Sequence, residues 1–137
     1  MIIDAKDSVL GRMATQAAKA ALSGEQVIIV NASDAVIIGS KNDIVDRYFQ
    51  RIHVGSTSKG PFHSRTVIGL VKRTIRGMVK RKSVRGMEAM RHITVYEGTP
   101  DDLKDKPKEE IAKVRSDRPV HKVKIGELSN ILKTKQI

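Results

Sequence analysis

Basic side chains are concentrated in one quarter of this chain. Ten Lys and Arg residues lie between Lys59 and His92, where Glu88 is the only acidic residue. The segment therefore carries +9 of the total formal charge of +11, and the rest of the chain is close to neutral. Guanidinium and ammonium groups bind phosphates and carboxylates through charge-assisted hydrogen bonds. This concentration of charge predicts that the segment binds an extended polyanion.

The lack of acidic neighbours separates this segment from an ordinary solvated helix face. Solvated faces usually mix both signs, because ion pairs between residues i and i+4 stabilise a helix. From Arg65 to Arg85 eight basic residues follow one another with no acid among them. Their mutual repulsion is tolerable if a polyanion supplies the missing countercharge. We therefore predict that the chain binds nucleic acid.

The candidate nucleic-acid contacts are the basic residues of this segment, one histidine and one glycine within it, and one basic residue near the N-terminus. They are Arg12, Lys59, His63, Arg65, Lys72, Arg73, Arg76, Gly77, Lys80, Arg81, Lys82, Arg85 and Arg91. Arg76 and Arg85 are the strongest candidates, because a guanidinium group can bridge phosphates in two-pronged fashion. An aromatic content of 3% argues against base stacking as the main mode of binding,. His63 and His92 contact phosphate, stack on a base or serve as ordinary surface residues, and the sequence leaves these alternatives open.

Membrane binding is the alternative use of a basic amphipathic helix. The apolar side of the 66–80 segment is aliphatic and contains no Trp or Phe. This side is also the only hydrophobic face available to attach the helix to the rest of the domain. We therefore expect no membrane partner.

Nucleotide, metal and catalytic sites lack the residues that they need. Gly55 and Gly60 have the spacing of a phosphate-binding P-loop, but Pro61 and Phe62 stand where Lys and Ser or Thr are required,. The four His residues show no metal-ligand spacing,. Acidic residues at predicted strand ends more often cap turns than catalyse reactions. We therefore predict no catalytic residue, no metal, no cofactor and no small-molecule substrate.

Length and composition favour one folded domain over residues 1–137. An apolar content of 39% is too high for a disordered chain, and the chain contains no Cys for disulfides,. No leader-like N-terminus and no run of about 20 apolar residues is visible, so we expect a cytoplasmic protein. Residues 101–137 are expected to form a helical tail of mixed charge that packs on the domain or extends from it.

Hydrophobic periodicity predicts that strands alternate with helices. Ser8 is the expected N-cap of the first helix, and Gly24 is its expected end. Residues 27–30 form a continuous apolar run, which is typical of a strand covered on both faces. The predicted strands are 2–4, 27–30, 36–38 and 93–96,. The predicted helices are 8–23, 41–52, 66–80, 108–114 and 127–133,. The predicted loops are 55–65 and 81–91. This order favours an α/β domain with a parallel sheet.

Two motifs resemble a known family. Residues 4–14, DAKDSVLGRMA, are similar to the opening of ribosomal protein thirteen of the large subunit. Residues 75–78, IRGM, followed by Arg85-Gly86 and by residues 93–100, ITVYEGTP, are similar to the long signature of that family. The ordered match covers roughly residues 2–100. The compact start and the short connection from Gly24 to Val27 look like archaeal members.

The resemblance implies a three-layer α/β/α fold with a four-stranded parallel sheet. It also implies a ribosome-bound protein that contacts large-subunit ribosomal RNA and neighbouring ribosomal proteins, supports subunit assembly and catalyses no reaction. Two alternatives remain open from the residues alone. One is an mRNA-binding translational regulator that acts off the ribosome, and the other is an RNA-modifying enzyme.

Overall fold

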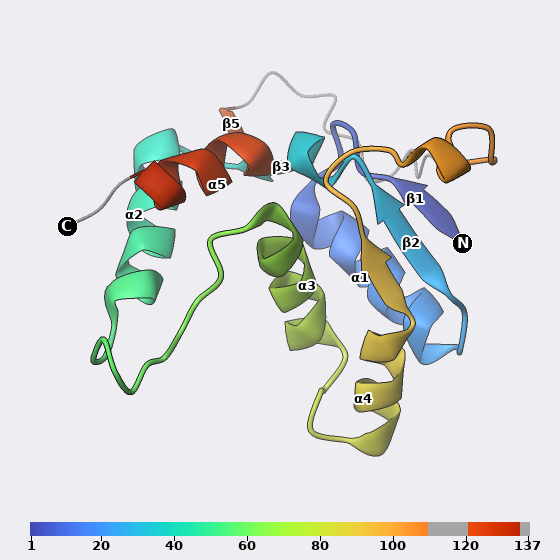
Figure 1. Ribbon diagram of the computed structural model, residues 1–137, viewed down its shortest axis with the longest axis horizontal. Coiled ribbons are helices and arrows are strands. Elements are labelled where there is room, and N and C mark those ends of the chain that lie inside the picture. Colours follow the sequence, from blue (N-terminus) through green and yellow to red (C-terminus); the bar gives the residue numbers. More distant parts are fainter. Residues whose placement is uncertain (110–120, 135–137) are drawn as a thin grey trace.

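Three parallel strands form the main sheet of the protein. The structure is a computed structural model that describes residues 1–109 and 121–134. The strands β1 (Ile2–Asp4), β2 (Val27–Val30) and β4 (Ile93–Val95) pair in the order β1-β2-β4 (Figure 1). Ile29 lies opposite Ile3 on one side and Val95 on the other. The prediction of a mixed α/β fold with a parallel sheet is confirmed.

The fourth predicted strand does not join this sheet. Strand β3 (Val36–Ile38) pairs antiparallel with β5 (Lys122–Lys124), and only a single parallel bridge joins Val36 to Val9. Parallel neighbours need a crossover of a dozen or more residues. Only residues 31–35 separate β2 from β3, and they contain the short 3-10 helix η1 (Ala32–Asp34). The four-stranded parallel sheet is therefore not observed in the described residues.

The sheet has one well-covered face. Val27 and Ile29 of β2 are fully buried on the side of the helices, whereas on the opposite side Val30 is fully buried and Ile28 is half-buried. The prediction that this strand is covered on both faces thus holds for Val27, Ile29 and Val30 and in part for Ile28. In the described part of the chain, the packed core lies between the sheet and helices α1 (Leu10–Leu22) and α3 (Val67–Met78).

Helix α1 packs closely because its inner side consists of small residues. Its buried positions are Leu10, Met13, Ala14, Ala17, Ala18 and Ala21. Gly24 ends the helix as predicted, with φ +92°. Ser8 is not the N-cap, because its hydroxyl instead donates to the carbonyl oxygen of Asp4 at 3.3 Å and the side chain is buried. Val9 occupies the cap position with no side-chain hydrogen bond.

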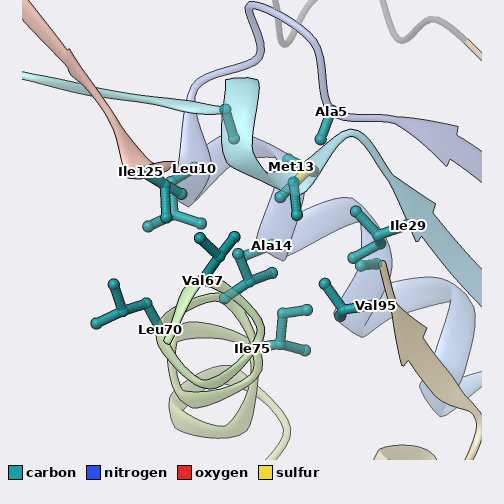
Figure 2. Packing of buried hydrophobic residues seen from close by; sticks show 14 of the residues in the cluster. Ala5, Leu10, Met13, Ala14, Ile29, Val67, Leu70, Ile75, Val95 and Ile125 are labelled. Carbon is teal, nitrogen blue, oxygen red and sulfur yellow. The ribbon is translucent and has the colours of Figure 1, made fainter. Parts of the chain in front are cut away.

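Helix α3 lies beside α1 and packs its apolar residues into the same core. Figure 2 shows Val67 of α3 beside Ala14 of α1 and Ile75 beside Val95 of β4, while Leu70 lies on the other side of the helix. The predicted helical period of this segment is therefore confirmed. Met78, the last residue of α3, is 41% exposed.

Helices α2 (Lys41–His53) and α5 (Ile125–Thr134) cover the small antiparallel sheet. Ile44 and Val45 of α2 are buried, while Tyr48 and Ile52 are half-buried. Ile125, Leu128 and Leu132 of α5 belong to the same buried cluster as the parallel sheet. The predicted helix at 127–133 is confirmed, whereas the one at 108–114 lies almost entirely outside the described residues.

Candidate nucleic-acid interface

Helix α3 presents a buried aliphatic face and a basic face. Thr66 caps its N-terminus by accepting a hydrogen bond from the Gly69 backbone N–H at 3.2 Å. Four residues of the helix are buried, namely Val67, Leu70, Val71 and Ile75. Lys72, Arg73 and Arg76 lie on the remaining surface, each at least partly exposed. The helix therefore holds these cations in place through its buried side.

The segment that follows α3 is a turn and a short helix, not the predicted 81–91 loop. Lys80 adopts φ +50°, and helix α4 (Val84–Arg91) begins after Ser83. The Ser83 hydroxyl accepts a hydrogen bond from the Gly86 N–H at 3.1 Å, and this cap was not recognised from the sequence,. Lys80, Arg81 and Lys82 are exposed in the turn.

Glycine is required where α4 crosses the turn. A Cβ atom on Gly86 would lie 2.4 Å from the carbonyl oxygens of Val79 and Lys80. Gly86 thus permits a close backbone approach within the protein. Gly77 differs, because a Cβ there would meet no atom within 4 Å and the residue is exposed beside Arg76. The space above Gly77 is open to a partner.

Side chains from three parts of the chain form a cationic cluster, consisting of Arg51, His63, Arg73 and Arg76. The guanidinium Nη2 of Arg73 lies 3.2 Å from the His63 Nε2. Burial, followed by the charge of Arg73, lowers the pKa of His63 below its usual value, and the other two arginines act in the same direction. The neutral imidazole can therefore accept a hydrogen bond from Arg73. Partial burial and the charges of Arg76 and Arg51 also lower the pKa of Arg73.

Sequence reasoning missed Arg51 as a member of this cluster. It belongs to α2, and its guanidinium carbon lies 5.6 Å from the Tyr48 ring centroid. Residues 1–58 contain as many acidic as basic residues, so their net charge gave no reason to select Arg51. A usable signal was present, because Arg47 and Arg51 are four residues apart and therefore share one side of a helix,.

The remaining predicted residues lie in different settings. The guanidinium of Arg85 donates to the Leu22 carbonyl oxygen at 3.2 Å and so connects α4 to the end of α1. Arg65 is half-buried, and its carbonyl oxygen accepts a hydrogen bond from Ser129 at 2.7 Å. Arg12, Lys59 and Arg91 are exposed on α1, on the 54–66 loop and at the end of α4, respectively.

The basic side chains of the described 59–92 segment are not neutralised by ion pairs. In residues 1–109 and 121–134, none of the ten Lys and Arg residues between 59 and 92 forms an ion pair. Ion pairs elsewhere in the described residues include those of Lys41 with Glu127, Lys104 with Asp101 and Lys124 with Asp34. A surface of this kind attracts an anionic partner.

A pocket of about 540 Å³ opens beside the cationic cluster, between α2, β3 and α3. Arg51, His63 and Arg73 contribute its charged and imidazole groups, and Tyr48 lies in its wall. These groups are suited to holding an anion. Among the described residues, no group of three His, Asp or Glu side chains could hold a metal ion, and no helix has the length and apolarity to cross a membrane.

The family model described as Ribosomal protein L13 matches residues 1–102, which include the whole basic segment. The chain belongs to this family. The resemblance inferred from the two motifs is thereby confirmed.

Individual members of the L13 family are similar over most of their length. The large ribosomal subunit protein uL13 of Thermoplasma volcanium is 39% identical, over 96% of this chain and 96% of that protein. The protein of the same name from Haloarcula marismortui is 45% identical over 74% of this chain and 70% of that protein. Both organisms are archaea, as the sequence suggested, and both names describe ribosomal proteins, not enzymes.

Proposed function

We propose that this L13-family chain binds large-subunit ribosomal RNA and supports assembly of the large subunit. Its binding surface consists of α3, the 79–83 turn, α4 and the 54–66 loop. The observation that carries the proposal is the unpaired charge of this surface, in a chain whose relatives are named as large-subunit proteins. The chain then resides on cytoplasmic ribosomes beside other large-subunit proteins.

Phosphate contacts dominate the proposed binding. Lys72, Arg73 and Arg76 offer a rigid row of cations, and the exposed turn from Lys80 to Lys82 extends it. Guanidinium groups recognise phosphates and 2′-hydroxyls of folded RNA by shape, with little dependence on base sequence. The open space at Gly77 allows an RNA strand to approach the helix backbone.

Sedimentation tests this function directly. Cell extract is separated on a density gradient after a wash at raised salt that removes loosely bound factors. We expect the chain to remain with the large subunits, because many phosphate contacts must be lost together for it to dissociate. Recovery of the chain only in free or messenger-bound fractions would contradict the proposal and would support a regulatory role off the ribosome.

A further inference from the structure

Phe62 is exposed in the middle of the basic surface. Its side chain is 72% exposed, the highest value among the large hydrophobic side chains of residues 1–109 and 121–134. The chain has only two Phe residues. A single exposed apolar side chain is common on protein surfaces, so the groups that surround the ring decide whether it binds a partner.

The backbone of the 54–66 loop contacts the Phe62 ring at Gly60. The N–H of Gly60 donates to the Ser56 carbonyl oxygen at 3.0 Å and closes a turn. Gly60 adopts φ +82°, and a Cβ on it would lie 3.1 Å from two ring carbons of Phe62. The ring therefore lies against the backbone at Gly60. The next residue, His63, is joined to α3 through Arg73.

Hollows lie on both sides of Phe62, and both are cationic. One of about 200 Å³ separates the ring from Lys72, Arg73 and Arg76 of α3. The other, of about 580 Å³, contains Arg65. Among the described residues, no carboxylate lines either hollow. An aromatic face beside several cations matches a nucleotide, which combines a flat base with a phosphate.

We propose that Phe62 stacks on an unpaired base of the bound RNA while the basic side chains of α3 hold the adjacent phosphates. This inference rests on the proposed function and adds to it a contact that phosphate binding does not need. Bases within an RNA double helix are already stacked on one another, so the base that meets Phe62 comes from a loop or a bulge.

The test uses full-length chains and large-subunit ribosomal RNA as the probe. Phe62→Leu keeps an apolar side chain and removes the aromatic face, whereas Phe62→Trp keeps the face. We expect the leucine variant to bind about tenfold more weakly, with an unchanged dependence on salt, since no charge is lost. The tryptophan variant should bind like the wild type.

Tyr96→Leu is the matched control, because Tyr96 is also an exposed aromatic residue, at 39%, and it follows β4, outside the proposed binding surface. It should leave the affinity unchanged. Ultraviolet cross-linking should join a nucleotide to the peptide that carries Phe62. Equal affinities of the leucine variant and the wild type would overturn stacking and leave the proposed function standing. If the wild-type chain did not bind the RNA, both the stacking contact and the proposed function would be contradicted.

Discussion

Replacing Lys72, Arg73 and Arg76 together with alanine is expected to weaken binding of large-subunit ribosomal RNA by roughly 3 kcal/mol or more, about a hundredfold. The three cations lie on one helix, and none forms an ion pair in the described residues. Each contributes about one phosphate contact. The slope of log affinity against log salt should therefore fall in magnitude by about 2 to 3. Filter binding at several salt concentrations measures both quantities.

A second triple variant separates position from charge. Lys6, Lys104 and Lys122 are exposed and lie outside the 59–92 segment. Their replacement with alanine removes the same formal charge, but it should change the affinity and the salt slope much less. Circular dichroism would verify that both proteins are folded. Equal losses in the two triple variants would show that only net charge matters and would refute a localised surface.

Ile75→Ala is expected to lower the free energy of unfolding by about 2 to 5 kcal/mol. Ile75 has no exposed surface, and its side chain extends from α3 toward Val95 of β4 (Figure 2). Truncation leaves a cavity where the basic helix meets the sheet. Urea denaturation measures the loss. At temperatures where the variant is folded, its RNA affinity should match the wild type, because the basic face is intact.

Met78→Ala serves as the control for that variant. Met78 belongs to the same helix, but its side chain is 41% exposed. Its truncation should cost less than about 1 kcal/mol, since little apolar area returns to water. If the two variants were equally stable, α3 would not be anchored through Ile75.

The parallel core could be predicted from the sequence because its signals are local. The apolar run at 27–30 and the helical period of α3 depend on neighbouring residues alone. The pairing of β3 with β5 depends instead on residues distant in the sequence, because Ile37 pairs with Val123. A single apolar residue between two lysines carries little strand signal. Helix α4 was missed because its eight residues give a short period and its cap depends on Ser83.

The charge of the proposed binding surface could be predicted from the sequence, but its full composition could not. Arg73, Arg76 and His63 come together much as the basic segment suggested. Arg51 joins them only because the chain folds α2 toward α3. The exposure of Phe62 likewise depends on the loop turn at Gly60, and a lone Phe in a sequence is more often buried.

Lysine labelling of purified large subunits tests the central claim most directly. Lys72, Lys80 and Lys82 should react with an acylating reagent in the free chain and be protected in the subunit. Ribonuclease digestion should restore their reactivity, because RNA provides the protection. Lys6, Lys104 and Lys122 should change less. Full reactivity of the first three lysines in intact subunits, or protection that survives ribonuclease, would contradict RNA binding by this surface.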